Sequence, residues 1–538
     1  MNDPVLQHGQ PPAWLTPSVL RGMKRGIERE TLRMQADGFI AKTPHPAALG
    51  SALTHPHITT DYAEALLELI TPPMDSPRQT LGFLRDLHAI VQQHLPAGET
   101  LWPLSMPCML DNDEQHIQLA QYGSSNLGQF KTLYRRGLGV RYGRRMQTIA
   151  GLHYNLSFPP ELFAAWHAAH PDGAAQSLQA FTDARYFGLI RNFIRLTPLV
   201  IYLLGASPTV CACFLTGREH HLKRLVAGTL HLPQATALRM GKLGYQNNAQ
   251  RQLGIHYNTL PDYVAGIRQA IGTSYAPFAA LGLDDADGEP LQINDHVLQI
   301  ENEYYSMVRP KQIAQSGETP AQALAKRGVA YVELRAVDID PYSDIGIRLE
   351  TACFLEVLAL SALLAPSPEL YFAEEERIAR NQSRVVDDGR RVDLCLETAT
   401  GEQLFTDWAA AELDAMQHAA ALLDHAYDST DYRAALAFMQ QRLADPALTL
   451  SAQVLADTQL AAGSWRMGHE LAVEHAATLL QYPVSPELRQ HFEQLAIQSR
   501  HDQAHIEQSD HLSFAQYVSA YRDHAVRPSS ASIEVNTP

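Results

Sequence analysis

The sequence predicts an α+β fold in which an antiparallel or mixed sheet is joined to a largely helical C-terminal third. Short runs of alternating polar and apolar residues dominate residues 20–160 and 290–340, and this period of two is typical of strands with one buried face. Residues 345–525 are instead rich in Ala and Leu at helical spacing. Because long, unequal segments separate the strands, the regular strand–helix alternation of a doubly wound parallel sheet is disfavoured.

The first two extended segments carry acidic side chains. In residues 25–31 (RGIERET), an extended backbone would project Glu28 and Glu30 from the same face. Residues 57–70 add three carboxylates: Asp61, Glu64 and Glu68. Apolar residues flank Glu68 on both sides, which is an unfavourable place for a carboxylate without a partner.

Two further strands each combine an apolar face with a polar one. In residues 148–158, one face holds Leu152, Tyr154, Leu156 and Phe158, and the other holds His153, Asn155 and Ser157. Residues 329–337 follow the same rule, with an inward pair and an outward pair: Val332 with Leu334, and Glu333 with Arg335. A charged pair at this spacing can lie side by side over a ligand.

The last expected strand and one helix complete the pattern. Residues 298–305 (LQIENEYY) alternate in the same way, with a polar face made of Gln299, Glu301, Glu303 and Tyr305. Residues 406–427 are predicted to form a helix with one apolar stripe, made of Leu413, Met416, Ala420 and Leu423.

At 538 residues the chain could form one large elaborated domain or two to three modules. We expect a single large domain over residues 18–525, with a sheet-forming core at about 20–345 and a mostly helical part at about 345–525. Residues 1–17 and 526–538 are polar or rich in Pro and Ser, so we expect loose tails there.

The composition excludes several classes of protein. A formal charge of -16 argues against nucleic acid as a partner, because that partner requires Lys and Arg. No run approaches the ~18 consecutive apolar residues of a membrane span, and no signal-peptide pattern opens the chain, so a cytoplasmic protein is expected. Five cysteines, embedded mainly in apolar runs, are expected to be free thiols.

The polar strand faces favour one kind of chemistry. Each strand alone is better explained by a solvated face with scattered salt bridges, but four such strands favour a shared site. Hard carboxylate oxygens with a single imidazole suit Mg²⁺ or Mn²⁺ better than zinc. Glycine-rich phosphate-binding motifs are absent, so if the protein uses ATP, metal ions and arginines would have to hold its phosphates.

Seven segments between about residues 20 and 345 stand in a recognisable order: RGIERETLRM, LGSALTHPHITTDYAEALLELITP, LWPLSMPC, LAQYGSSNLGQFKTLYRRGL, RYGRRMQTIAGLHYNLSF, LQIENEYYSMVRPK and YVELRAVDIDP. In this order they resemble the proteobacterial glutamate–cysteine ligases (γ-glutamylcysteine synthetases), and weaker similarity continues toward the C-terminus. The resemblance implies a curved, mainly antiparallel sheet related to glutamine synthetase, which forms the floor of the active site.

Carried over by position, the resemblance implies six metal ligands: Glu28, Glu30, Asp61, Glu68, His153 and Glu333. Arg335 would contact the transferred phosphate or the glutamate. The cysteine pocket would be formed by Tyr62, Tyr134, Arg135, Leu138, Gln147, Arg239, Tyr245 and Tyr305. Tyr62 stands where the family leads us to expect Phe, and residues 217–233 also diverge.

The implied reaction is the first step of glutathione synthesis. The γ-carboxylate of L-glutamate would take a phosphoryl group from ATP, and the amine of L-cysteine would then displace phosphate to give γ-glutamylcysteine and ADP. Feedback inhibition by glutathione and a monomeric state are also expected. Two alternatives stay open at this point: a related ligase with another amine acceptor, and an inactive protein that keeps the fold.

Overall fold

The computed structural model describes residues 12–525, apart from residues 172, 227, 242, 244–253 and 316–317. Its centre is a seven-stranded sheet with the order β2-β3-β1-β5-β10-β9, in which β4 also pairs with β1. Every pair in this sheet is antiparallel. The strands are β1 (Lys24–Met34), β2 (Ile58–Thr60), β3 (Leu66–Ile70), β4 (Thr100–Leu101), β5 (Leu152–Ser157), β9 (Val308–Lys311) and β10 (Tyr331–Val337). The predicted antiparallel sheet is therefore confirmed, whereas its relation to glutamine synthetase stays a prediction.

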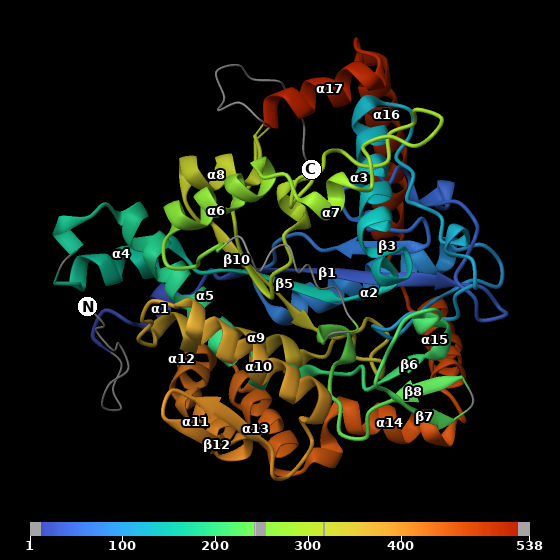
Figure 1. Cartoon of the computed structure of the whole chain (residues 1–538). Helices are drawn as coiled ribbons and strands as arrows, with labels where there is room; N and C mark the ends of the chain where they lie inside the picture. The colour runs from blue at the N-terminus through green and yellow to red at the C-terminus, as the bar shows by residue number, and fades with distance from the viewer. Residues whose placement is uncertain are drawn as a thin grey trace.

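Helices cover both sides of this sheet (Figure 1). In Figure 1, α3, α6, α8 and α17 lie above the sheet and α9–α14 lie below it. The helices up to the end of the sheet are α1 (Pro17–Leu20), α2 (Pro77–His94), α3 (Asn126–Tyr142), α4 (Pro160–Ala169), α5 (Leu178–Leu204), α6 (Leu260–Gly272), α7 (Ala276–Ala279) and α8 (Pro320–Arg327). The later helices are α9 (Leu349–Leu364), α10 (Phe372–Asp388), α11 (Phe405–Ala415), α12 (Gln417–Tyr427), α13 (Asp431–Ala444), α14 (Leu450–Leu460), α15 (Ser464–Gln481), α16 (Pro486–Ser509) and α17 (Phe514–Ala525).

Two small sheets lie outside the central one. Strands β6 (Thr209–Cys211), β8 (Thr229–His231) and β7 (Lys223–Val226) form a three-stranded sheet. Strands β11 (Cys395–Thr398) and β12 (Gly401–Leu404) form a hairpin before α11.

The period of two correctly predicted which face of the central strands is buried. Tyr154 and Leu156 of β5 and Val332 and Leu334 of β10 are completely buried. Helices α5 and α9 pack beneath this face, and both are apolar around most of their circumference. Helix α5 is long and apolar enough to cross a membrane, but 89% of its most apolar window is buried inside the fold, as in a core helix.

The strand predicted over residues 298–305 is wrong. Glu301–Glu303 form a short 3-10 helix instead. The carboxylate of Glu303 accepts a hydrogen bond from the backbone N–H of Gln299 at 2.7 Å. This local side-chain bond competes with sheet pairing, and it turns the segment back on itself.

Two other boundaries differ from the prediction. The helix expected over residues 406–427 is divided at Met416 into α11 and α12, although all four residues of the predicted stripe are buried. Within the predicted N-terminal tail, Leu15 is 3% exposed and Trp14 stacks on Trp166 at 5.2 Å, so packing begins by Trp14. Residues 1–11 and 526–538 lie outside the described residues.

Candidate functional site

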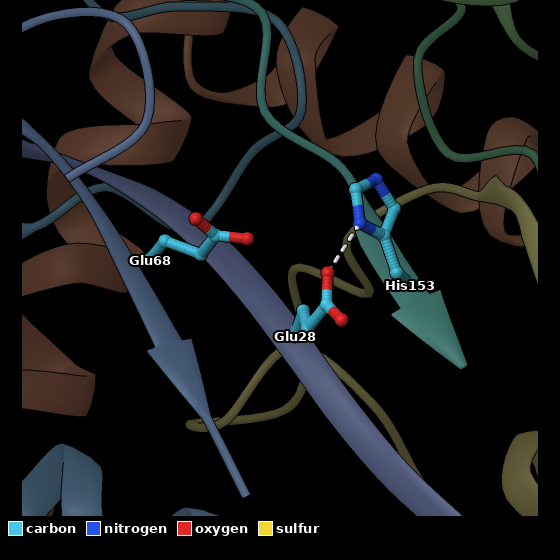
Figure 2. A group of neighbouring side chains, drawn as sticks. All are labelled: Glu28, Glu68 and His153. Carbon is cyan, nitrogen blue, oxygen red and sulfur yellow. Dashed lines mark hydrogen bonds and ion pairs between the residues drawn. The ribbon is translucent and has the colours of Figure 1, made fainter. Parts of the chain in front are cut away.

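The register of three neighbouring strands brings acidic side chains together. Glu30 of β1 lies opposite Glu68 of β3, and Glu28 of β1 lies opposite His153 of β5. Because side chains alternate along a strand, all four project from the face that is turned away from α5 and α9. Figure 2 shows Glu28, Glu68 and His153 pointing toward one another, and one ligand atom of each lies within 4.8 Å of the others.

The imidazole of His153 joins the carboxylates of β1. Its Nδ1 lies 3.0 Å from Glu28 Oε2, and its Nε2 lies 3.5 Å from Glu30 Oε1. Asn155 of β5 donates to the other oxygen of Glu28 at 2.8 Å. These contacts hold the side chain of Glu28 in one position.

Strand β10 adds the predicted pair Glu333 and Arg335. Arg335 Nη1 lies 3.2 Å from Glu333 Oε2 and 3.4 Å from His153 Nδ1. Lys311 Nζ, from the neighbouring strand β9, lies 3.0 Å from Glu333 Oε1. Burial opposes ionisation of Glu333, but Lys311 and Arg335 outweigh it and hold the pKa of this carboxyl well below its usual range.

In contrast to Glu333, Glu68 lies in surroundings that disfavour its ionised form. Burial raises the pKa of Glu68 well above its usual range, and the neighbouring carboxylates of Glu28, Asp61 and Glu30 raise it further. Asp61 reaches this cluster from the turn after β2. These buried carboxylates repel one another, and a hard divalent cation bound between them would remove the repulsion. The residues present therefore fit Mg²⁺ or Mn²⁺.

The carboxylates form one wall of a cavity of about 1690 Å³. All six predicted metal ligands and Arg335 line this cavity. Seven of the eight predicted substrate-binding residues line it too: Tyr62, Tyr134, Arg135, Leu138, Gln147, Arg239 and Tyr305. The eighth, Tyr245, lies outside the described residues.

The two predicted pocket arginines are held by the protein itself. Arg135 donates from Nε to the carbonyl oxygen of Asp61 and from Nη1 to that of Lys131, and its guanidinium lies 4.6 Å from the ring centre of Tyr122. Arg239 pairs with Asp338 and donates to the carbonyl oxygen of Val337 at 2.7 Å. Each arginine therefore fixes backbone beside the cavity, in addition to any contact with a substrate.

The hydroxyl that distinguishes Tyr62 from Phe is directed at helix α3. It is buried without a hydrogen-bond partner among the described residues, and a side chain at Gly139 would collide with it. Glycine at this position gives the hydroxyl its space. The structure thus accounts for a tyrosine here by the small size of Gly139.

Several cavity residues were missed by the sequence analysis. Arg309 and Lys311 alternate on β9, so the period of two could have identified them. Asp502, Tyr517 and Tyr521 come from α16 and α17, and no pattern in those helices distinguishes a cavity wall from a solvated face.

Glu64 and Glu303, which are outside the implied set of metal ligands, are both buried. Glu64 accepts from the backbone N–H groups of His45 and Gln121 at 2.7 and 2.8 Å. Glu303 pairs with Arg141 at 3.1 Å. These two carboxylates stabilise the loops around the cavity.

Comparisons with a family model and with known relatives point to one protein family. Residues 15–385 match the family model described as glutamate-cysteine ligase. A glutamate–cysteine ligase from Azotobacter vinelandii is 47% identical over 94% of this chain and 95% of its own length. The corresponding protein from Alcanivorax borkumensis is 45% identical over 94% of this chain and 96% of its own length.

Two solved structures are also similar. The glutamate–cysteine ligase of Francisella tularensis in complex with AMP matches with a TM-score of 0.86 and 33% identity, over 94% of this chain and 98% of that one. A bifunctional glutathione synthetase from Pasteurella multocida matches with a TM-score of 0.69 and 25% identity, over 87% of this chain and 54% of that one.

Proposed function

The chain belongs to the glutamate–cysteine ligase family, and we propose that it joins the γ-carboxylate of L-glutamate to the amine of L-cysteine with consumption of ATP. The products would be γ-glutamylcysteine, ADP and phosphate. The observation that carries this proposal is the cluster of carboxylates beside Arg335 on the wall of one large cavity. The AMP bound to the Francisella tularensis protein supports a nucleotide as co-substrate.

The metal-binding role belongs to six residues in this proposal: Glu28, Glu30, Asp61, Glu68, His153 and Glu333. Together they offer carboxylate oxygens and one imidazole on a single face of the sheet. Bound Mg²⁺ or Mn²⁺ would neutralise negative charge on the phosphates of ATP. Asn155 and Lys311 position Glu28 and Glu333, respectively, for this role.

Arg335 would act on the transferred phosphoryl group. Its guanidinium is held beside Glu333 and His153, at the edge of the carboxylate cluster. In the first step, a γ-carboxylate oxygen of glutamate attacks the γ-phosphorus of ATP, ADP leaves, and γ-glutamyl phosphate forms. In the second step, the cysteine amine attacks the γ-carbonyl carbon and phosphate leaves. Fixed positive charge stabilises both transition states, so no protein nucleophile is required.

The acceptor pocket is proposed to include Tyr62, Tyr134, Leu138, Gln147 and Tyr305, with Arg135, Arg239 and Tyr245. Aromatic walls would enclose the small thiol side chain. Because Arg135 is tied to the backbone of Asp61, it would also couple this pocket to the metal ligands. Feedback inhibition by glutathione, a monomeric state and a cytoplasmic location stay predictions.

The decisive assay measures ADP release with glutamate and a panel of amine acceptors, with Mg²⁺ and with EDTA. The expected result is ADP formation that requires glutamate, a divalent cation and cysteine, with γ-glutamylcysteine identified by mass spectrometry. ADP release with glutamate and ammonia but not with cysteine would reassign the enzyme to another amine acceptor. A protein that released no ADP with any acceptor would lack the proposed activity.

A further inference from the structure

Lys131 lies on the face of α3 that lines the cavity. Residues Lys131, Tyr134, Arg135 and Leu138 are spaced so that they share one side of the helix, and all four border the cavity. Tyr134, Arg135 and Leu138 are members of the proposed acceptor pocket. Lys131 therefore stands one helical turn from the place where the acceptor amine is expected.

The amine of Lys131 has no polar partner in the described part of the chain. Its Nζ lies 5.0 Å from the ring centre of Tyr122, and no hydrogen bond or ion pair joins it to a described residue. Other lysines are paired: Lys311 contacts Glu333 at 3.0 Å, and Lys326 contacts Glu318 at 3.1 Å. Lys131 is thus an uncommitted amine at a cavity wall.

The surroundings of Lys131 favour the neutral amine. Burial and the neighbouring guanidinium of Arg135 lower its pKa to about 7, against the weaker opposing effect of Glu68. Other titratable groups line the same cavity: His55, Asp61, Asp502, Tyr517 and Tyr521. A lysine in this state exchanges protons near neutral pH, which is the property required of a general base.

The proposed reaction requires such a base. An α-amino acid carries an ammonium group near neutral pH, and an ammonium has no lone pair with which to attack a carbonyl carbon. The carboxylates of the cluster are assigned to metal ions. On the premise of the proposed function, we propose that Lys131 is a catalytic residue that accepts a proton from the ammonium of the acceptor amino acid.

The lone pair of the Lys131 amine takes one proton from the acceptor ammonium. The free amine forms a C–N bond to the γ-carbonyl carbon of γ-glutamyl phosphate, and the C–O bond to phosphate breaks. The departing phosphate takes the second proton of the attacking nitrogen, and Lys131 returns its proton to solvent.

The test compares two acceptors in wild type, Lys131→Met and Lys131→Arg. Cysteine requires deprotonation, whereas hydroxylamine is already neutral at pH 7.5 and traps acyl phosphates as hydroxamates. We expect both variants to lose about 10²-fold or more of the kcat with cysteine and to keep hydroxamate formation within about threefold of wild type. Arginine keeps the positive charge but cannot release its proton, so it separates the base role from a role of charge alone.

The pH profile gives a second readout. Wild-type kcat with cysteine should fall below about pH 7, and this acidic limb should disappear from the residual activity of Lys131→Arg. Lys326→Met, at an exposed lysine, is the matched control and should behave as wild type with both acceptors. Circular dichroism and thermal unfolding verify that each variant is folded.

Three results would overturn the proposal. They are equal losses with cysteine and hydroxylamine, unchanged activity of Lys131→Met with cysteine, or full activity of Lys131→Arg. Failure of the proposed function has a different appearance, because wild type would then form no γ-glutamylcysteine. The two failures are therefore distinguishable in the same experiment.

Discussion

Arg335 contacts both a carboxylate and the imidazole of the proposed metal site. Its Nη1 lies within 3.4 Å of Glu333 and His153. This position allows one guanidinium to stabilise charge on a phosphoryl group without contributing to the hydrophobic core. If Arg335 has the proposed chemical role, its removal should be visible in turnover before it is visible in stability.

Arg335→Ala is predicted to lower kcat by about 10²–10³-fold, the usual effect of removing one fixed donor to a charged transition state. The melting temperature should change little, because Lys311 still pairs with the buried Glu333 in this variant. Steady-state kinetics and thermal unfolding measure the two quantities. Arg380→Ala, on the exposed side of α10, is the control, and near-normal turnover of Arg335→Ala would refute the role.

Glu68 is predicted to reduce stability in the absence of a metal. Its carboxylate is buried beside Glu28, Asp61 and Glu30, so Glu68→Gln removes repulsion. In EDTA the variant should melt a few degrees above wild type. In Mg²⁺ wild type should instead melt above the variant. A bound ion stabilises the folded protein more when it binds more tightly, and Glu68→Gln removes one proposed ligand.

Differential scanning fluorimetry with EDTA and with a Mg²⁺ series tests this prediction. Glu470→Gln, at an exposed position of α15, should leave both curves unchanged. An identical response of Glu68→Gln and wild type to Mg²⁺ would show that Glu68 is not a ligand.

At the scale of elements, two of the ion pairs on β1 have different surroundings. Arg25 pairs with Glu356 of α9 at 2.7 Å, and both side chains are completely buried. Tyr154 and Tyr432 also donate to Glu356, at 2.6 and 2.9 Å. Lys24 pairs with Asp75 at 2.5 Å, but these side chains are 48% and 66% exposed.

Glu356→Gln is predicted to lower the free energy of unfolding by about 3–5 kcal/mol, because it leaves the buried guanidinium of Arg25 without a counter-charge. Asp75→Asn should cost no more than about 1 kcal/mol, since exposed pairs contribute little. Urea unfolding of both variants measures the difference. Equal effects of the two substitutions would contradict this account of β1.

The elements also show how far the sequence could predict the fold. The period of two identified the polar faces of β1, β5 and β10 correctly, because each strand also packs against a helix: β1 against α2, β5 against α9 and β10 against α5. The same period misled over residues 298–305, where a bond from Glu303 to the backbone of Gln299 stabilises a turn. Alternation of polarity does not reveal such a local bond.

At the scale of the whole molecule, the cavity combines segments that are distant in sequence. Strands β1 and β3 contribute carboxylates to one wall, while α16 and α17 contribute Asp502, Tyr517 and Tyr521. The carboxylates that line the cavity could be predicted because the alternation of polarity along their strands and the resemblance select the same residues. The contribution of the C-terminal helices could not, because it depends on how α17 packs against α3.

Stability of the whole protein should depend on pH through His88. This histidine is buried in α2, and burial together with Arg29 holds its pKa well below the usual range. Unfolded His88 takes up a proton as the pH falls through about 6.5, while folded His88 does not. Its contribution to stability is therefore intact above about pH 6.5 and decreases below it, by about 1.4 kcal/mol per pH unit.

Urea unfolding at pH 7.5, 6.5 and 5.5 measures this slope. His88→Leu should show a smaller loss of stability between pH 6.5 and 5.5 than wild type. His418→Leu, at an exposed position of α12, should keep the wild-type slope. Identical slopes in all three proteins would exclude the contribution of His88.

The most direct test of the proposed reaction follows an oxygen atom. Glutamate labelled with ¹⁸O in its γ-carboxylate is incubated with cysteine, ATP and Mg²⁺, and the released phosphate is analysed by mass spectrometry. If the γ-carboxylate takes the phosphoryl group beside Arg335, each phosphate formed should carry one ¹⁸O atom from glutamate. Unlabelled phosphate formed together with γ-glutamylcysteine would contradict the acyl phosphate and the role assigned to this site.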